Sequence, residues 1–279
     1  MKRDLRDKVI LITGASSGIG RATALACAAA GMHVSMMARR ESKLIEVAKE
    51  VSALDAKTHY FVGNVADVGA VKTWVEQAYQ TFGRMDAVYA NAGYGMASPM
   101  LDMTDADVRG MFEVNFFGTL NTLRAALPYV TTTPDGLKHL LVCSSCLSEL
   151  GPPESGVYAA TKGAQDLMAQ GLRAELAGEG VKVTTVHPVG TKTNFFKVAQ
   201  EQSGVKAGAR IEPPGFLMQT PEHVAGRIVK ALKRPRAEVW PMTMARFAAA
   251  MATAMPGLTA WILARGYARE LKKTKGQGE

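Results

Sequence analysis

Cysteine is scarce in this chain. Its 279 residues include three cysteines, Cys27, Cys143 and Cys146, and a small, odd number of cysteines does not make a disulfide framework. The scarcity excludes the disulfide-rich secreted class and favours a reducing compartment, so we expect a cytoplasmic protein. The five histidines lack the HxxH and HxxxH spacings of metal ligands, and we therefore expect no metal site.

A long apolar leader is missing as well. The first fourteen residues, MKRDLRDKVILITG, mix charges of both signs with a short apolar run, whereas a secretory signal needs about 7–15 consecutive apolar residues. Repeats, low-complexity tracts and interdomain linkers are absent from residues 1–241. We therefore expect one domain over 1–241, no signal peptide, and a separate C-terminal extension over 242–279.

Acidic residues are fewer than basic ones in this chain. The chain carries 33 Lys and Arg against 25 Asp and Glu, which gives a net charge of +8 and a pI near 9.4. Such a balance favours anionic partners, namely a phosphate-bearing cofactor, an acidic lipid surface or a nucleic acid. Because the sequence contains no DNA- or RNA-binding motif, we expect no nucleic-acid partner.

Short apolar runs alternate with longer helical patterns along residues 1–241. The runs predict strands at 8–13, 32–38, 58–63, 86–90, 137–144, 181–187 and 237–240. The patterns between them predict helices at 18–31, 41–54, 67–82, 104–128, 156–178 and 220–233. Strands that alternate with helices form right-handed βαβ crossovers. The predicted fold class is therefore α/β, a doubly wound, mostly seven-stranded parallel sheet of the Rossmann-like type.

A glycine-rich turn joins the first predicted strand to the first predicted helix. The sequence TGASSGIG places glycines where a tight turn and a closely approaching backbone need residues without Cβ. The amides at the start of the helix would then face the phosphates of a dinucleotide. Glycines at this spacing can also serve packing alone, but their place in a βαβ unit favours the phosphate role. The residues predicted to bind the cofactor here are Gly14, Ser16, Ser17, Gly18, Ile19 and Gly20.

The end of the second predicted strand indicates which dinucleotide binds. Folds that take NAD place an acidic residue there to hold the ribose 2′-hydroxyl, whereas an arginine accommodates the 2′-phosphate of NADP. This chain has Arg39 and Arg40, and the first acid after the strand is Glu41. We therefore expect NADP(H), although two adjacent arginines are also compatible with a solvated charge pair at a helix start.

A CxxC pair stands at the end of the fifth predicted strand. Cys143 and Cys146 have the spacing of a redox dithiol, but such dithiols usually begin a helix, which lowers the thiol pKa. Cys143 instead ends a buried strand, where a free cysteine usually belongs to the core. We therefore expect no redox function, and we expect Cys146 to line a substrate pocket.

A tyrosine and a lysine share one face of the next predicted helix, because Tyr158 and Lys162 lie four residues apart. Reduction of a carbonyl by hydride leaves an alkoxide that needs a proton. The ordinary tyrosine pKa of about 10 is too high for easy proton exchange near neutrality. A neighbouring ammonium lowers that pKa. We therefore predict that Tyr158 donates the proton and Lys162 lowers its pKa, although an isolated pair at this spacing is usually a surface contact.

With these motifs the sequence resembles the short-chain dehydrogenase/reductase family over about residues 8–241. The motifs are TGASSGIG at 13–20, NVAD at 64–67, ANAG at 90–93, EVNFFG at 113–118, YAATK at 158–162 and HPVGTKT at 187–193. In that family a serine lies thirteen residues before the tyrosine, which selects Ser145 over Ser144. The resemblance implies four catalytic residues, Asn115, Ser145, Tyr158 and Lys162. It implies that Ser145 hydrogen-bonds the substrate oxygen and that Asn115 supports Lys162 through a water.

The resemblance also extends the predicted cofactor site beyond the glycine-rich turn. It implies NADP(H) contacts from Asn64, Val65, Asn91, Ala92, Gly93, Tyr158, Lys162, Pro188, Thr191 and Thr193. Two positions depart from the family pattern: Asn64 stands where an aspartate is usual, and Val189 where a glycine is usual. The amide oxygen of Asn64 can still accept a hydrogen bond from the adenine amine. Val189 adds bulk near the nicotinamide.

Apolar side chains gather near the predicted active-site mouth. The residues predicted to contact substrate are Tyr94, Met96, Cys146, Phe195 and Phe196. They suit a medium or bulky apolar carbonyl, such as a lipid ketone, a 3-oxoacyl chain, a steroid or an aromatic aldehyde, although the two phenylalanines can equally serve packing alone. The predicted function is an NADP(H)-dependent oxidoreductase that interconverts a carbonyl and an alcohol. The alternative is a catalytically idle NADP(H)-binding regulator or scaffold.

The resemblance implies a homodimer or homotetramer. Many members pair their two long helices across a two-fold axis, and the corresponding helices here are predicted at 104–128 and 156–178. Their apolar residues suffice for a shared bundle: Phe112, Phe116, Leu120, Leu167 and Leu172.

The extension over 242–279 has a different composition. Its uncharged run, 247–264, is split by Pro256-Gly257, so neither helical piece is long enough to cross about 30 Å of hydrocarbon. The second piece carries Trp261 and ends in a basic cluster, a pattern that also suits a helix lying on an anionic membrane. We therefore expect a helical extension that packs on its own domain or a partner subunit, or else holds the protein peripherally at a membrane.

Overall fold

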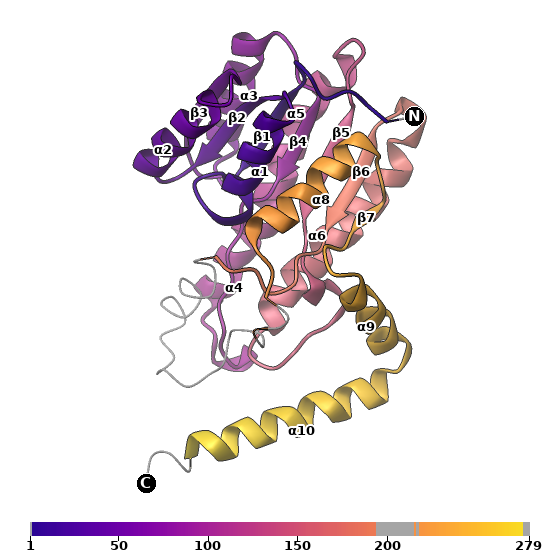
Figure 1. Ribbon diagram of the computed structural model, residues 1–279. Helices are drawn as coiled ribbons and strands as arrows, with labels where there is room; N and C mark the ends of the chain where they lie inside the picture. Colours follow the sequence, from indigo (N-terminus) through magenta and orange to yellow (C-terminus); the bar gives the residue numbers. More distant parts are fainter. Residues whose placement is uncertain (1, 194–214, 216–217, 276–279) are drawn as a thin grey trace.

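Seven strands form one sheet in the computed structural model, which describes residues 2–193, 215 and 218–275 (Figure 1). The strands are β1 (Val9–Thr13), β2 (His33–Ala38), β3 (Thr58–Val62), β4 (Ala87–Ala90), β5 (His139–Cys143), β6 (Lys182–Val186) and β7 (Glu238–Val239). The helices that alternate with them are α1 (Gly18–Ala29), α2 (Glu41–Ser52), α3 (Val68–Phe82), α4 (Asp105–Phe112), α5 (Gly118–Thr132), α6 (Gly156–Glu175) and α8 (Pro221–Lys233). The predicted α/β class is confirmed.

The strand order reverses in the middle of the sheet. All neighbours pair in parallel, in the order β3-β2-β1-β4-β5-β6-β7. In β1, Ile12 pairs with Met36 of β2 on one side and with Tyr89 of β4 on the other. In a doubly wound sheet, ligands bind at the carboxyl ends of the strands beside such a reversal. The segments that follow β1, β4 and β5 therefore frame the candidate site.

Alternate residues of each strand face two different helix layers. In β1, Ile10 and Ile12 pack with α1, α2 and α8, whereas Val9 and Leu11 pack with α3, α5 and α6. All four side chains are fully buried, as expected where a parallel sheet is covered on both faces. The continuous apolar runs in the sequence follow from this double coverage.

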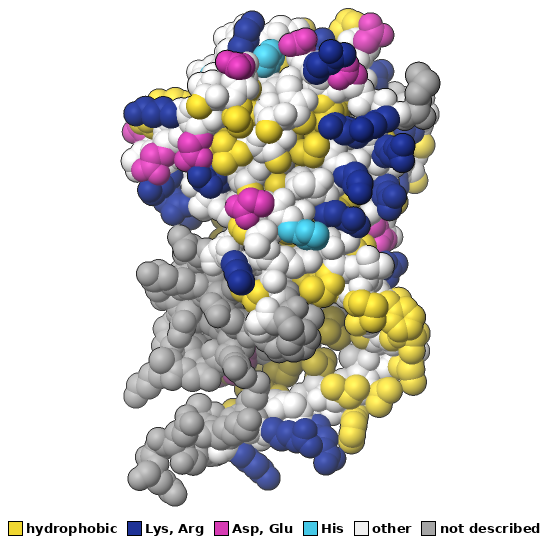
Figure 2. Space-filling view, viewed as in Figure 1, with side chains coloured by type: hydrophobic (Ala, Val, Ile, Leu, Met, Phe, Trp, Pro, Cys, Tyr) yellow, Lys and Arg dark blue, Asp and Glu magenta, His cyan; other side chains and the backbone are white. Residues whose placement is uncertain are grey.

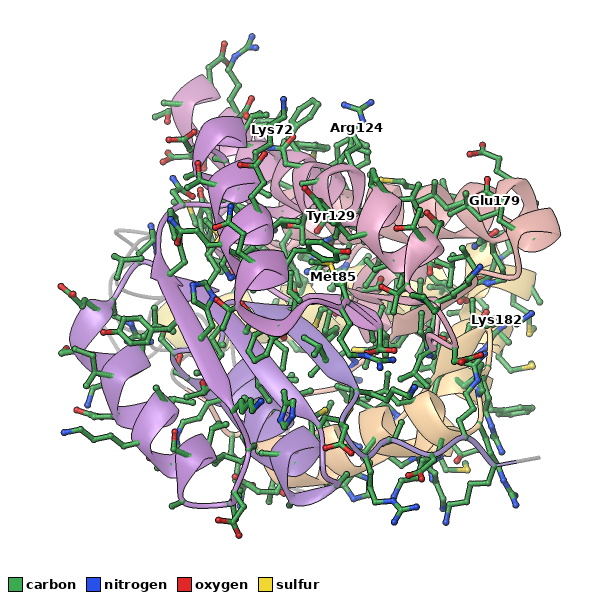
Figure 3. All side chains as sticks on the ribbon, turned by 90° about the horizontal axis from the view of Figure 1, so that it is seen from above. Lys72, Met85, Arg124, Tyr129, Glu179 and Lys182 are labelled. Carbon is green, nitrogen blue, oxygen red and sulfur yellow. The ribbon has the colours of Figure 1, made fainter. Side chains whose placement is uncertain are left out.

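The layer of α3, α5 and α6 lies above the sheet in Figure 3. Lys72 of α3 and Arg124 of α5 lie on its outer surface, and Met85 lies toward the sheet. Trp74, the largest fully buried side chain, projects inward from α3 and donates from Nε1 to Ser35 Oγ at 2.9 Å. The indole N–H is thus satisfied inside the core, as a buried tryptophan requires.

Two predicted helix starts have the capping geometry that their sequences indicate. The hydroxyl of Thr104 accepts from the amide of Asp107 at 3.2 Å, and that of Thr220 accepts from the amide of His223 at 3.1 Å. Each bond satisfies an amide that the helix itself cannot pair. At the other end of a helix, Gly31 follows α1 with φ +87°, the left-handed conformation typical of a helix stop.

The prediction of one continuous helix over 104–128 is wrong in its continuity and in its end. It consists of α4, a π-helical turn at Glu113–Phe117, and α5, which runs on to Thr132. Pro128 lies inside α5 and does not end it. A π-helical turn inserts one extra residue into a helix and is frequent at functional sites. Here it contains Asn115, one of the predicted catalytic residues.

The extension after β7 forms two helices, α9 (Thr243–Ala254) and α10 (Pro256–Lys275). They lie beyond the lower end of the sheet in Figure 1 and meet at a bend of 109°. Within the described residues, no single helix has the length and hydropathy of a membrane span, and only this bent pair passes when taken together. The prediction that the proline-glycine step divides the extension into two helices is confirmed.

Candidate active site

The glycine-rich turn closes tightly at the end of β1. Gly14 and Gly18 have φ values of +66° and +55°, which residues with a Cβ rarely adopt. A Cβ at Gly14 would lie 2.9 Å from the Cα of Ala92, and a Cβ at Gly20 would overlap the carbonyl oxygen of Gly14. Because α1 begins at Gly18, its first amides border the turn. This turn has the shape and the free donors of a phosphate cradle.

Two arginines stand next to this cradle, at the carboxyl end of β2. The guanidinium of Arg40 donates from Nη2 to Ser17 Oγ at 2.7 Å and to Ser16 Oγ at 3.1 Å. Arg39 is exposed, and its charge acts on the phenol of Tyr94, whose pKa it lowers while burial raises it more strongly. Both arginines are therefore positioned to meet an anionic group beside the turn.

The segment after β4 links the cradle to the predicted catalytic residues. The hydroxyl of Thr13 accepts from the amide of Asn91 at 2.9 Å, and the side-chain amide of Asn91 donates to the carbonyl of Thr13 at 3.0 Å. A Cβ at Gly93 would lie 2.9 Å from Asn115 Oδ1 and 3.4 Å from Lys162 Nζ. The segment ANAG is therefore confined between the glycine-rich turn on one side and Asn115 and Lys162 on the other.

Ser145 follows the carboxyl end of β5 and is buried. Its backbone is extended, and its hydroxyl accepts from the amide of Leu147 at 3.1 Å, which starts a short 3₁₀ turn at Cys146–Glu149. The hydroxyl also forms a hydrogen bond with the phenol of Tyr158. The structure thus brings two of the predicted catalytic residues into direct contact.

Tyr158 and Lys162 occupy the first two turns of α6. Lys162 is buried, and its Nζ donates to the carbonyl oxygen of Cys143 at 2.8 Å. The same Nζ lies 5.7 Å from the centre of the Tyr158 ring. The shared helix face predicted from the four-residue spacing is therefore present.

The pKa values of Tyr158 and Lys162 are shifted in a different way from the one that the sequence predicts. Burial raises the pKa of Tyr158, and the hydrogen bond with Ser145 offsets this only in part. Burial also lowers the pKa of Lys162. Lys162 was predicted to lower the pKa of Tyr158, but in the structure its ammonium is bonded to the Cys143 carbonyl and desolvation of the phenol dominates.

Asn115 is held between α6 and the segment after β4. Its Oδ1 accepts from the amide of Tyr94 at 3.0 Å, and its Nδ2 donates to the carbonyl of Tyr94 at 2.9 Å and to Thr161 Oγ1 at 3.0 Å. The hydroxyl of Thr119 donates to the carbonyl of Asn115 at 2.7 Å. The side chain therefore fixes the position of the backbone at Tyr94. The water predicted to join it to Lys162 stays a prediction.

The two nearby cysteines have different surroundings. Cys143 is buried at the end of β5, as predicted, and Cys146 is partly exposed; both are free thiols. Burial raises the pKa of the Cys146 thiol, whereas a redox-active cysteine needs a lowered pKa. These surroundings favour a packing role for Cys143.

The remaining predicted cofactor residues follow the carboxyl ends of β3 and β6. Asn64 is exposed after β3, and its Oδ1 accepts from the amide of Ala66 at 3.2 Å. Thr193 lies next to the turn, since a Cβ at Gly18 would be 3.1 Å from its Cγ2. The other three residues are buried: Val65, Pro188 and Thr191.

Three of the five predicted substrate residues are described. Tyr94, Met96 and Cys146 are partly buried, and the phenol of Tyr94 points to α4, where a Cβ at Gly110 would lie 3.1 Å from its oxygen. Phe195 and Phe196 lie outside the described residues.

A buried histidine behind Ser145 was missed in the sequence. Nδ1 of His187 lies 3.1 Å from the carbonyl oxygen of Ser145, and its ring stacks on Trp240 with 4.3 Å between centroids. Asp166 lies 3.5 Å from the opposite ring nitrogen. Burial lowers the pKa of His187, although Asp166 raises it. The sequence shows a histidine directly before Pro188, but it does not show the partners of His187, which come from segments far away in sequence.

The fold, the phosphate cradle and the Ser145–Tyr158–Lys162 arrangement together define a nucleotide-binding oxidoreductase. Residues 8–204 match the family model described as short chain dehydrogenase. The chain therefore belongs to the short-chain dehydrogenase/reductase family.

Individual relatives agree with this assignment. The chain is similar to an uncharacterized oxidoreductase of Staphylococcus aureus, at 37% identity over 83% of this chain and 94% of that protein. A glycine betaine reductase of Emericella nidulans matches at 34% identity over 84% of this chain, but the match spans only 18% of that longer protein. Among solved structures, an alcohol dehydrogenase of Thermococcus sibiricus complexed with 5-hydroxy-NADP matches with a TM-score of 0.73 and 27% identity, covering 84% of this chain and 96% of that one.

The residues present fit a nicotinamide dinucleotide. Gly14, Gly18 and Gly20 leave the room that a pyrophosphate needs, and Arg40 brings positive charge to its edge. When bound, such a cofactor would donate or accept a hydride. The chain itself must then orient the substrate and supply or accept the proton.

Proposed function

We propose that the protein interconverts a carbonyl and an alcohol, with NADP(H) as cofactor and Tyr158 as the proton donor to the carbonyl oxygen. The observation that carries this proposal is the hydrogen-bonded pair of Ser145 and Tyr158, with Lys162 one helical turn away. Ser145 stabilises the same oxygen by hydrogen bonding. Lys162 holds a positive charge near the phenol and reaches the ribose. Asn115 acts as a positioning residue.

The preference for NADP(H) over NAD(H) rests on Arg39 and Arg40. A 2′-phosphate is a dianion, which arginine binds through charge-assisted hydrogen bonds. Arg40 already contacts Ser16 and Ser17 of the turn, and Arg39 is exposed beside it. The absence of an acid between the end of β2 and Glu41 supports the same choice, since an acid there would hold a 2′-hydroxyl instead.

The proposed substrate is a medium or bulky apolar carbonyl or the corresponding alcohol. Met96, Cys146 and Val189 bring apolar surface to the site, and Phe195 and Phe196 follow in sequence. NADPH oxidation measured against a panel of lipid ketones, 3-oxoacyl thioesters, steroids and aromatic aldehydes tests the proposal. Turnover with at least one of these classes is the expected result.

A catalytically idle NADP(H)-binding regulator or scaffold is the second candidate. The contact of Lys162 with the Cys143 carbonyl and the raised pKa of Tyr158 favour it. The intact set of Asn115, Ser145, Tyr158 and Lys162 argues against it, because a scaffold has no use for a proton donor. Tight NADPH binding without turnover on any panel member would favour the scaffold.

We further propose a homodimer or homotetramer in a reducing, cytoplasmic compartment. On the helices expected to pair, Phe117 of the π-helical turn before α5 and Leu167 of α6 are 43% and 68% exposed. Such apolar side chains gain from being covered by a second subunit. The three free thiols Cys27, Cys143 and Cys146 support the reducing compartment. Nucleic acid is not among the proposed partners.

A further inference from the structure

Exposed apolar side chains follow one line along α9. Met244, Phe247 and Met251 are 72%, 63% and 43% exposed, and their spacing of three and four residues places them on one helix face. Single exposed apolar residues are common on protein surfaces, but a contiguous patch marks an interaction surface. Figure 2 shows hydrophobic side chains gathered over this end of the molecule.

A second line continues along the first half of α10. Leu258, Trp261 and Ile262 are 46%, 57% and 54% exposed and again share one helix face. Tryptophan is enriched at membrane–water interfaces, where its ring and its N–H meet different surroundings. The described part of the protein buries its other two tryptophans, Trp74 and Trp240.

Basic residues extend the same face of α10 toward its end. Arg265, Arg269 and Lys272 follow Ile262 at spacings of three and four residues and are exposed. The guanidinium of Arg265 lies 5.2 Å from the centre of the Trp261 ring. Residues 243–275 carry six Lys and Arg and one Glu. On α10 an apolar stripe, formed by Leu258, Trp261 and Ile262, thus continues directly into a basic stripe, formed by Arg265, Arg269 and Lys272.

The two helices are attached beside the candidate active site. In α9, Arg246 lies 3.4 Å from Glu149, which ends the 3₁₀ turn after Ser145. In α10, the hydroxyl of Tyr267 donates to Glu154 at 3.1 Å, just before α6. The exposed stripes of α9 and α10 are therefore held on the side of the sheet that carries the site.

We propose that α9 and α10 dock the protein on the surface of an anionic lipid membrane. The apolar stripes enter the interfacial region, and the basic residues that follow meet the acidic head groups. Neither helix alone spans the bilayer, because no single helix of the described residues is long and apolar enough, and the pair that passes together is bent by 109°. A second copy of the chain is a poorer occupant, since each copy would bring its own basic stripe to a shared interface.

Co-sedimentation of the full-length protein with vesicles tests the docking. Vesicles of phosphatidylcholine with phosphatidylglycerol are compared with vesicles of phosphatidylcholine alone, at low and at high salt. We expect binding to the anionic vesicles at low salt and release at high salt, because salt screens the basic stripe. Protein that stays in the supernatant with anionic vesicles at low salt overturns the proposal.

Two double variants distinguish binding through the basic stripe of α10 from binding through the overall positive charge of the protein. Arg265→Gln with Arg269→Gln should weaken vesicle binding by about 25-fold, since each basic residue near an anionic surface contributes about fivefold. The matched control, Lys57→Gln with Lys72→Gln, removes two exposed charges outside the extension and outside the helices expected to pair (Lys72 is labelled in Figure 3), and should bind as the parent does. Equal weakening in both pairs contradicts the proposal.

The apolar stripe has its own readout in tryptophan fluorescence. Brominated lipids should quench Trp261 in the docked protein and leave the buried Trp74 and Trp240 unaffected. The variant Trp261→Phe should lose the quenching while it still sediments with anionic vesicles. Phe247→Ser should weaken sedimentation with an unchanged circular dichroism spectrum and melting temperature. A dimer that Phe247→Ser dissociates, without any vesicle binding, would assign the stripe to a second copy and overturn the docking.

Discussion

The guanidinium of Arg40 donates to the hydroxyl of Ser17 at 2.7 Å and so joins the end of β2 to the phosphate cradle. Arg40 is thereby tied to the turn by hydrogen bonds, although both it and its neighbour Arg39 are exposed. The two arginines therefore have different expected functions. We expect Arg40 both to order the turn and to contribute charge to the 2′-phosphate site, and Arg39 to contribute charge alone.

Replacement of Arg39 by Asp should shift cofactor preference toward NADH. The change removes a partner of the 2′-phosphate and adds an acceptor for the 2′-hydroxyl. We expect the ratio of kcat/KM for NADPH over NADH to fall by about 10–100-fold, the range for one lost charge-assisted hydrogen bond. The remote exposed variant Lys57→Asp controls for net charge. An unchanged ratio in Arg39→Asp would remove Arg39 from the 2′-phosphate site.

Replacement of Tyr158 by Phe should abolish turnover and keep NADPH affinity nearly intact. The ring retains its packing in the first turn of α6, and only the proton donor is lost. Loss of a general acid costs about 10²–10⁴-fold in rate. Fluorescence titration with NADPH and steady-state rates on the same preparation separate the two effects. If the variant keeps more than a few per cent of kcat, Tyr158 is not the acid.

Stability should fall with acidification because His139 is buried in β5. Its Nε2 lies 2.8 Å from Thr184 Oγ1, and burial lowers its pKa from 6.5 to about 3. Between these values the unfolded chain binds a proton that the folded chain does not, so stability rises with pH. The free energy of unfolding should drop by about 2 kcal/mol from pH 7.5 to pH 5 through this group.

Urea denaturation at the two pH values measures that drop. His139→Gln keeps a partner for Thr184 and should flatten the pH dependence by the His139 share. The variant His33→Gln, at a partly exposed position, should keep the slope of the parent. An unchanged slope in His139→Gln would show that other groups cause the acid sensitivity; His59 and His187, whose pKa values burial also lowers, are the alternatives.

Asp86 should be among the most sensitive positions for stability. Its buried carboxylate accepts from the amide of Val9 at 2.8 Å and from two nitrogens of Arg84 at 2.7 Å each. Asp86→Ala leaves that amide and part of the guanidinium unpaired, and should cost about 3 kcal/mol. Chemical denaturation should detect this easily. Asp4→Ala, which breaks an exposed ion pair, should leave the midpoint unchanged.

Leu167→Arg should dissociate the proposed oligomer. Leu167 projects from α6 and is 68% exposed in the single chain, so the arginine is tolerated in a monomer and repelled in a two-fold interface. Sedimentation velocity at micromolar concentration should show the parent as an oligomer and the variant as a monomer. A monomeric parent would refute the assembly itself.

The sequence predicted the fold because its signals are local. A continuous apolar run marks a strand buried on both faces, and Thr104 and Thr220 mark helix starts through bonds that span only three residues. The π-helical turn at Glu113–Phe117 escaped detection because one extra residue barely alters an apolar period. The helix expected to end near residue 128 runs on to Thr132 with Pro128 inside it, because its packing in the fold outweighs the local sequence.

The site was predictable as a set of positions and less so as a set of contacts. The four-residue spacing of Tyr158 and Lys162 places them on one face, but the bond from Lys162 to the Cys143 carbonyl joins α6 to β5 and depends on their packing. The stack of His187 on Trp240 likewise joins two neighbouring strand ends that are distant in sequence. Such contacts follow from the tertiary fold alone.

Because Asn115 lies in the π-helical turn, the number of residues that join α4 to α5 determines where its side chain lies. A helix rotates by about 100° for each residue, so deletion of one residue at Val114 would turn α4 by that angle relative to α5. Asn115 could then no longer meet both bonds of the Tyr94 backbone, which it now makes at 2.9 and 3.0 Å. A single deletion here would thus be more harmful than many substitutions. In an insertion–deletion scan, the segment from α4 to α5 should tolerate exchange of residues far better than a change in their number.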